Sequence, residues 1–337
     1  METQRLGRAR QRPPCLRRSD LAALVLVIIL FQFPAALEAA ERIRLTVSNP
    51  NMSFMTAAIA LRKGFFQQEG LDAEIIQMRV PVMITALSTS EIDYTMVFGS
   101  VVRAAIRGLP VRVVASFLDG SAHALIARPE TKSVKELRGK TLAVESYGAS
   151  SDVVARMMIK HFGIDPDKEM RIVALGADRA RLAALTEGLV DVAVISPPAD
   201  TAAKRAGFNL LARAYELFKF AFVGLGANVR KTQERPDEVK RTIKALIKAN
   251  RYIRENREGT TDILVAWGRV SRDDALASYD STWRIFSPDG TIPEDGLKLV
   301  IDQAKTELRI SREVSLGEVS DVTILKEAQR ELSVKPR

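Results

Sequence analysis

The segment ALSTSEID, residues 86–93, has a counterpart in ALTEGLVD, residues 184–191, and this pair is the key to the fold. Both segments begin with Ala-Leu and a hydroxyl residue, and both end in an aliphatic residue followed by aspartate. The two aspartates, Asp93 and Asp191, are 98 positions apart. Each segment leads directly into an apolar run, YTMVFGS and VAVISPP, of the length expected for a buried strand. The match indicates that one structural unit occurs twice.

Three further pairs of predicted strands fall at nearly the same displacement. They are residues 43–49 with 141–147, 73–78 with 171–176, and 110–117 with 207–214. Any α/β protein alternates strands with helices, but a register kept across a whole lobe is typical of a duplication. We therefore predict an α/β protein with two similar lobes, each an open parallel sheet flanked by helices.

Two glycines mark the end of the first helix in the first half. In ALRKGFFQQEGLDAEII, residues 60–76, Gly64 follows an apolar-periodic segment and Gly70 precedes an alternating one. Glycine enters the left-handed conformation without a Cβ penalty, so it commonly ends helices. The alternation after Gly70 has the period of a strand. The stretch predicts a compact helix-to-strand return that belongs to the scaffold.

Two segments connect the predicted lobes, which indicates a hinge. Residues 119–133 cross first, with a strand over 122–128, and residues 218–229 return. The expected division is a signal peptide over 1–40, a first lobe over 41–122, a second lobe with the crossing over 123–222, and a return with C-terminal helices over 223–337. Pro236 suits the first position of the first of these helices. The others are expected near 260–268, 273–285, 293–308 and 322–332, packed on the first lobe.

The first 40 residues have the pattern of an export signal. Six arginines precede the apolar run at 21–33, and the small-residue segment AALEAA follows at 35–40. This order is typical of a secretory signal peptide, and thirteen apolar residues are fewer than the roughly 20 that a membrane span needs. Cleavage after Ala39 and after Ala40 both stay open, as do the general secretory route and, from Arg17-Arg18, the twin-arginine route. We expect a periplasmic protein.

Charge and cysteine content exclude several classes of function. The net charge is +9, and after residue 40 the chain holds 44 basic against 38 acidic residues, interspersed along the later helices. No basic stripe points to nucleic acid. The single cysteine, Cys15, precedes the apolar run, so it cannot serve as a lipid anchor following it, and the exported form would contain no thiol. His123 and His161 are expected to be structural, and two distant histidines do not readily make a zinc site. We expect no catalytic residue, metal or cofactor.

Candidate ligand-binding residues follow the predicted strands, because open α/β sheets bind ligands outside the carboxyl ends of their strands. Two loops stand out, SNPNMSF at 48–54 and its counterpart SYGASSD at 146–152. The full set is Asn49, Asn51, Ser53, Arg79, Gly99, Ser100, Ser146, Tyr147, Gly148, Ser150, Ser151, Ser196 and Pro197. Helix capping by asparagine or serine is a second interpretation that is compatible with ligand contact.

The second loop is expected to supply most of the polar contacts. It opens a helix, and the free N–H groups of a helix N-terminus carry about half a positive charge, which favours an anion. Gly148 would allow close approach, and Asp152 is expected to act only as a first-turn acid. Arg79 is the best fixed cation, although a solvent-facing loop arginine is the alternative.

Several collinear segments resemble the solute-binding proteins of nitrate/sulfonate/taurine-type ABC importers, a family that includes thiamine-pyrimidine precursor binders. They are AIALRKGFFQQEGLDAEI, ALSTSEIDYTMVFGS, GLPVRVVA, SVKELRGKTLAV and ALTEGLVDVAVISPP. The resemblance covers roughly residues 43–230 and weakens in the C-terminal helices. It implies a type II periplasmic-binding fold, with two similar open-sheet α/β lobes joined by a two-strand hinge.

The resemblance also implies a function without catalysis. A monomeric receptor would capture a small polar or anionic solute, of the sulfonate, nitrate or pyrimidine-precursor class, and deliver it to a transiently bound ABC permease in the membrane. The alternative is an enzyme on the same fold, related to thiamine-pyrimidine synthesis. Those relatives use a cysteine-rich iron stretch that this chain lacks.

Overall fold

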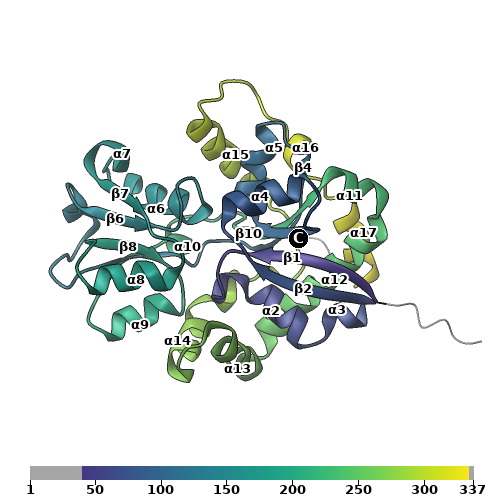
Figure 1. Ribbon diagram of the computed structural model, residues 1–337, viewed down its shortest axis with the longest axis horizontal. Coiled ribbons are helices and arrows are strands. Elements are labelled where there is room, and N and C mark those ends of the chain that lie inside the picture. The colour runs from purple at the N-terminus through teal and green to yellow at the C-terminus, as the bar shows by residue number, and fades with distance from the viewer. Residues whose placement is uncertain (1–39, 334–337) are drawn as a thin grey trace, which may run out of the picture. The chain divides into compact units, whose positions relative to one another are not determined.

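The computed structural model describes residues 40–333, which form two five-stranded mixed sheets and the helices around them (Figure 1). The predicted signal peptide, with Cys15, lies outside the described residues apart from Ala40. Among the residues that are described, no helix is both long enough and apolar enough to cross a membrane.

The first sheet has the strand order β2-β1-β3-β10-β4. Its strands are β1 (Glu41–Val47), β2 (Leu71–Gln77), β3 (Tyr94–Val97), β4 (Val111–Leu118) and β10 (Val223–Asn228). Strand β1 runs parallel to β2 and β3, whereas β10 is antiparallel to both of its neighbours.

The second sheet repeats this order as β7-β6-β8-β5-β9. Its strands are β5 (Ala124–Ala127), β6 (Thr141–Val144), β7 (Arg171–Ala174), β8 (Val192–Ile195) and β9 (Asn209–Arg213). Here β5 is the antiparallel strand. In both sheets one strand is formed by the chain that crosses from the other sheet. Strand β10 lies between β3 and β4, and β5 lies between β8 and β9.

The prediction of parallel strands is confirmed for the four repeated strands of each sheet, but the strand that crosses from the other half runs antiparallel to them. The chain leaves the first sheet at the carboxyl end of β4 and enters the second sheet as β5. Because β5 is antiparallel to β8, it enters at the end where β8 finishes. A strand that enters a sheet at the carboxyl end of its neighbour must run against it. The same reasoning holds for β10 on the return.

The helix-to-strand return predicted around the two glycines is present. Helix α2 (Met55–Arg62) follows the 3₁₀ turn η1 (Met52–Phe54), and the short α3 (Phe65–Gln68) precedes β2. Gly64 and Gly70 both have φ of 69°, the left-handed conformation that favours glycine. The remaining helices of this lobe are α4 (Val80–Ser88) and α5 (Phe98–Ile106).

The second sheet is accompanied mainly by short helices. They are η2 (Val134–Leu137), α6 (Ser150–His161), α7 (Pro166–Glu169), α8 (Asp178–Thr186), α9 (Ala199–Arg205) and α10 (Ala214–Leu217). His161 ends α6, as the sequence predicts, and it is exposed.

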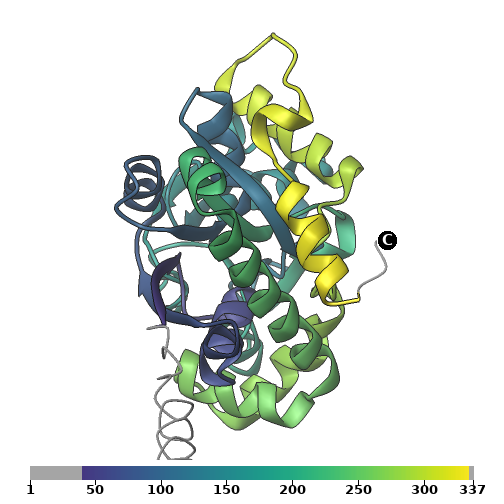
Figure 2. The ribbon, with the colours of Figure 1, turned by 90° about the vertical axis from the view of Figure 1, so that its right-hand side faces the viewer.

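The C-terminal part is helical, and its longest helix begins at Pro236 as predicted. The elements are α11 (Val229–Glu234), α12 (Pro236–Glu255), α13 (Arg257–Gly268), α14 (Arg272–Thr282), η3 (Trp283–Ile285), α15 (Glu294–Leu308), α16 (Leu316–Val319) and α17 (Thr323–Glu331). Helix α12 packs between α2 and α17, and Figure 2 shows α12 in green beside α17 in yellow. Helix α15 packs on α5.

Helix α14 also contacts two helices that accompany the second sheet, α9 and α10. Arg205 of α9 donates a hydrogen bond from Nη2 to Asp274 Oδ2 of α14 at 2.7 Å. Tyr215 of α10 donates from its hydroxyl to the carbonyl of Ser281 at 2.6 Å. The α13–α14 pair therefore links the two halves in addition to the two crossing strands.

Candidate functional site

Two loops related by the repeat meet beyond the carboxyl ends of β1 and β6. The first loop carries Asn49 and Asn51, and the second begins at Glu145. Asn49 Nδ2 donates to Glu145 Oε1 at 3.1 Å, and the backbone N–H of Asp178 donates to Asn49 Oδ1 at 3.4 Å. These bonds join the two sheets at positions that the repeat makes equivalent.

Asn51 caps a helix, which is one of the two interpretations of the sequence, and it also contacts the other half. Its Oδ1 accepts from the backbone N–H of Ser53 at 3.1 Å and so caps η1. Its Nδ2 donates across the cleft to Asp178 Oδ2 at 2.6 Å and to Ser196 Oγ at 2.7 Å. Next to it, the N–H of Met52 donates to the carbonyl of Pro197 at 3.0 Å. Asn51, Ser196 and Pro197, all selected from the sequence, lie together.

Two carboxylates that the sequence reasoning missed accept the hydrogen bonds of these amides. Burial raises the pKa of Glu145, which accepts from Asn49 and from Ser151 Oγ at 3.2 Å. Burial acts in the same direction on Asp178, but the charge of Arg181 and the hydrogen bond from Asn51 help to outweigh it, so the pKa of Asp178 is lowered. Arg181 is fully buried and forms an ion pair with Asp178.

His123 lies beside the same carboxylates, just before β5. Burial lowers its pKa to about 4, although the charge of Asp178 opposes that shift. Its Nδ1 is 3.0 Å from Ser121 Oγ, and its ring meets Phe222 edge to face. A neutral imidazole in these contacts agrees with a structural role, and it also adds a polar edge to the cavity described next.

A small central cavity separates the two loops. Its volume is about 20 Å³, and both sheets contribute to its walls. The lining residues are Ser48, Asn49, Asn51, Phe54, Val80, Met96, Val97, His123, Glu145, Ser150, Ser151, Phe222 and Val223. A space of this size holds about one water molecule. The two loops are therefore closed on one another in this conformation.

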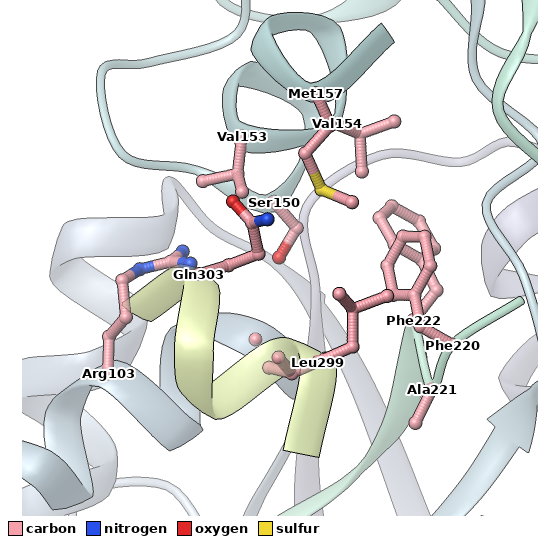
Figure 3. A pocket seen from close by; sticks show the side chains of 12 residues that line it. Arg103, Ser150, Val153, Val154, Met157, Phe220, Ala221, Phe222, Leu299 and Gln303 are labelled. Atoms are coloured by element: carbon pink, nitrogen blue, oxygen red, sulfur yellow. The ribbon is translucent and has the colours of Figure 1, made fainter. Parts of the chain in front are cut away.

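Ser150 lies at a second small cavity of about 20 Å³, shown in Figure 3. The side chains of Arg103, Ser150 and Gln303 point toward a common space, with Met157, Phe220 and Phe222 on its apolar side. Ser150 Oγ is buried and has no hydrogen-bond partner within residues 40–333. A Cβ at Gly99 would lie 3.4 Å from this oxygen. Ser150 and Gly99, both selected from the sequence, thus approach each other from α6 and α5.

An outer pocket of about 510 Å³ opens on one side of these cavities. Ser100, Ser146, Tyr147 and Gly148 from the predicted set all line it, together with Arg103. Arg103 donates to Ser100 Oγ at 2.9 Å and to the carbonyl of Gly148, so it bridges α5 and the second loop. Its Nη1 is also 3.6 Å from Glu307 Oε2 of α15. Burial lowers the pKa of Arg103, although the charge of Glu307 opposes that shift.

Asp152 is a first-turn acid of α6, as expected, but it also makes contacts that the sequence does not predict. Its carboxylate is buried, accepts from the backbone N–H of Gly148 at 2.8 Å and pairs with Arg156 at 2.8 Å. The loop's own acid thus occupies the N–H of Gly148 that the anion hypothesis left free, and Glu145 accepts from Ser151 nearby. Both carboxylates weaken the case for an anion at this helix N-terminus.

Two members of the predicted set lie apart from these contacts. Arg79 precedes α4 as its N-cap, is exposed, and lines none of the cavities described above. Ser53 is buried in η1, and its Oγ has no hydrogen-bond partner among the described residues. Solvent exposure explains Arg79 better than an anion contact does.

The missed residues carried only weak signals. Glu145 directly follows the strand TLAV, and Asp178 begins a helix, where an acid has a local explanation in the helix dipole. Their position in the repeat was the usable signal, because each follows a strand of the second half. Among residues 40–333, no three His, Cys, Asp or Glu side chains are grouped so that they could hold a metal ion.

Comparison with protein families gives one match that covers most of the chain. The sequence model of the family described as "NMT1/THI5 like" matches residues 49–259. No curated protein is significantly similar in sequence.

Solved structures show the fold at low sequence identity. The ligand-binding component of an ABC-type import system from Staphylococcus aureus, with zinc bound, has a TM-score of 0.73 at 14% identity, covering 86% of this chain and 99% of that one. The periplasmic nitrate-binding protein of Synechocystis PCC 6803 has a TM-score of 0.71 at 15% identity, with 88% and 90% covered. The periplasmic aliphatic sulphonate binding protein of Escherichia coli has 0.67 at 17% identity, with 82% and 91% covered. This chain therefore has the periplasmic-binding-protein fold.

Proposed function

The chain belongs to the NMT1/THI5-like family, and we propose that it is an extracytoplasmic receptor that captures a small polar solute between two lobes and delivers it to an ABC permease. One neighbour with the same fold is described as the ligand-binding component of an ABC-type import system, and two others are described as periplasmic binding proteins for sulphonate and nitrate. The export signal expected over residues 1–40 agrees with this location. The receptor acts as a monomer and contacts the permease transiently.

One observation carries the proposal. The loop after β1 faces the loops after β6 and β7 of the other half, so that Asn49 meets Glu145 and Asn51 meets Asp178. A hinge between two facing half-sites is what a receptor that closes on its solute needs. We propose the division that the sequence predicts, with the first lobe over 41–122, the second over 123–222, and the return over 223–337.

The groups in the central cavity favour a solute that donates hydrogen bonds there. Amides, hydroxyls and the carboxylate of Glu145 face the space, and neither lysine nor arginine lines it among the described residues. A carboxylate accepts hydrogen bonds and repels a bare oxyanion at short range. Of the three expected solute classes, a pyrimidine precursor with N–H donors therefore suits this cavity better than nitrate or a simple sulfonate.

A catalytic role has less support. An enzyme would need a nucleophile or a general base in the site, and His123 is a buried group whose pKa is lowered to about 4. Glu145 and Asp178 are both used in contacts between the two loops. We propose binding without chemistry.

A thermal-shift screen of polar solutes on protein purified from the periplasm of a Gram-negative host tests the proposal. At a hundredfold excess over Kd a ligand adds roughly 2.7 kcal/mol to the stability of the native state, which shifts the melting temperature measurably. Small-angle scattering with the hit should give an unchanged or smaller radius of gyration, never a larger one. Intact mass should show loss of residues up to Ala39 or Ala40.

Two variants test where the solute binds. Asn49→Ala and Ser150→Ala should each weaken binding several-fold, because each lost hydrogen bond costs about 0.5–1.5 kcal/mol. Calorimetry checks this against Arg79→Ala as the control, since Arg79 is exposed and does not line the cavities. Wild-type affinity in both loop variants would contradict the proposed site.

A further inference from the structure

A larger pocket, of about 790 Å³, shares no lining residue with the outer pocket that Tyr147 lines. We call it the Trp267 pocket; it is lined chiefly by residues within 47–51, 177–182 and 266–270. Asn49 and Asn51 line both this pocket and the central cavity. The central cavity holds only about one water, whereas the Trp267 pocket has the volume of an ordinary small-molecule site. An organic solute that reaches the two asparagines can extend into it.

The end of α13 packs against both halves of the protein and forms the third wall of this pocket. A Cβ at Gly268 would lie 3.5 Å from the carbonyl oxygen of Pro50 and 3.6 Å from Cγ of Pro198. Arg179 of α8 donates from Nη2 to the carbonyls of Gly268 at 2.9 Å and Arg269 at 3.0 Å. The C-terminal helices thus take part in the site, although they lie beyond the repeated halves.

Trp267 brings an unused hydrogen-bond donor to this wall. Its Nε1 is buried and has no partner within residues 40–333. An indole N–H can only donate, and a buried donor without an acceptor is costly. The indole also offers a broad flat face to a planar group. A solute that carries an acceptor on a flat ring would use both features.

The charges around the Trp267 pocket favour an anion. Arg62, Arg179 and Arg269 line it, and none of the three forms an ion pair with a carboxylate in the part of the chain that the structure describes. The two acids in the lining are already paired, Asp178 with Arg181 and Asp274 with Arg205. Positive charge is therefore in excess here.

The outer pocket, which Tyr147 lines, has a different balance of charges. Its buried cation, Arg103, is shared between Ser100, the carbonyl of Gly148 and the carboxylate of Glu307. Glu307 itself lines that pocket. An anion there would meet a carboxylate, whereas guanidinium groups without carboxylate partners can bind an anion in the Trp267 pocket.

We propose that the solute extends from the central cavity into the Trp267 pocket with a flat apolar group that carries an anion, such as an aryl sulfonate or aryl carboxylate. The solute then has hydrogen-bond donors at the end that meets Glu145 in the central cavity, and negative charge at the end that meets Arg62 and Arg269. Trp267 contacts its ring. This inference rests on the proposed receptor function, because it concerns the same solute.

Two matched fragments test the charge requirement. Benzenesulfonate and benzenesulfonamide have nearly the same shape, but only the first is charged at neutral pH. In the variant Trp283→Phe, Trp267 is the only tryptophan of the chain, so its fluorescence reports on this pocket alone. We expect benzenesulfonate to change that fluorescence at millimolar concentration, with an affinity at least about fivefold greater than that of benzenesulfonamide.

Variants on the same background locate the bound fragment. Arg62→Gln combined with Arg269→Gln should weaken benzenesulfonate binding at least about fivefold and leave benzenesulfonamide unchanged. Arg309→Gln is the matched control, because Arg309 is exposed, ends α15 and does not line the Trp267 pocket. It should change the binding of neither fragment. Trp267→Phe, followed by calorimetry, should weaken benzenesulfonate binding less than the double arginine variant does.

Three results would overturn the inference. They are an absent response to benzenesulfonate, equal responses to the two fragments, or an undiminished response in the double arginine variant. In any of these cases the receptor function would still stand if the thermal-shift screen finds a solute whose binding depends on Asn49. Failure of both experiments would remove the receptor function as well.

Discussion

The loops after β1 and β6 occupy the same place in the two halves, yet they differ in chemistry. The first loop presents the amides of Asn49 and Asn51, which donate hydrogen bonds. The second half presents the carboxylates of Glu145 and Asp178, which accept them. The repeat therefore determined where polar groups lie, and divergence between the halves made them complementary. Two carboxylate loops would instead face each other as acceptors without donors and with like charges.

The two carboxylates also differ from each other. Asp178 lies beside the buried Arg181, which helps to lower its pKa, whereas burial dominates at Glu145 and raises its pKa. Asp178 is thus a fixed negative group of the interface. Burial opposes the charge of both carboxylates, but only at Glu145 do the other interactions fail to outweigh it.

The largest effect is expected from Asp178→Ala. This change removes the acceptor for Asn51 and Ser196 and leaves Arg181, which is fully buried, without its carboxylate. Breaking a buried pair from one side costs about 3–5 kcal/mol. Denaturant unfolding should show a loss of that size. The exposed Asp302→Ala is the control, with a change within about 0.5 kcal/mol; equal losses in the two variants would contradict the assigned role.

A smaller loss is expected from Arg103→Gln, on the other side of the cleft. Arg103 bridges α5 to the carbonyl of Gly148, and its removal also leaves the half-buried Glu307 without its cation. Loss of a charged hydrogen bond costs about 1.5–3 kcal/mol. Unfolding should show this cost, and Arg107→Gln, an exposed neighbour, serves as the control. A stability unchanged by Arg103→Gln would mean that this bridge does not hold the loops together.

The smallest effect is a change in pH dependence caused by Glu145→Gln. The folded-state pKa of Glu145 is raised by burial, so the folded protein binds more protons than the unfolded one between the ordinary and the raised value. In that window wild-type stability falls as the pH rises, and the glutamine variant lacks this fall. As the pH rises from 4 to 8, the melting temperature of the variant should rise relative to that of the wild type by a few degrees at most. A constant difference over this range would contradict the raised pKa.

Asp178 should behave in the opposite way. Its folded-state pKa is lowered, so its contribution to stability is present above its unfolded pKa and is lost as the pH falls through the folded value. The comparison of the two carboxylates therefore predicts pH slopes of opposite sign in one lobe.

Much of the scaffold could be predicted because it depends on periodic apolar patterns and glycine positions. The paired strands, the two φ-positive glycines and the start of α12 at Pro236 follow from such local rules. Strand direction does not follow, because a short apolar run such as AHALIAR fits either direction. The antiparallel β5 and β10 result from the path of the chain between the sheets.

The site could be predicted in its location more than in its polarity. Asn51 and Ser196 were expected near a ligand and do lie within 2.7 Å of each other. The anion preference of the second loop was inferred from helix-terminal N–H groups, which Asp152 and Glu145 alter through contacts that the local sequence does not reveal. Trp267 lies outside the repeated halves, so the comparison of halves could not select it.

A double-mutant cycle between Asn51 and Asp178 tests the central claim most directly. The claim is that the two repeated halves meet through complementary groups, and these residues, 127 positions apart, are joined at 2.6 Å. Unfolding free energies of wild type, Asn51→Ala, Asp178→Ala and the double variant give their coupling energy. A charge-assisted hydrogen bond predicts a coupling of at least about 1.5 kcal/mol. Additivity within about 0.5 kcal/mol would contradict a direct contact between the halves.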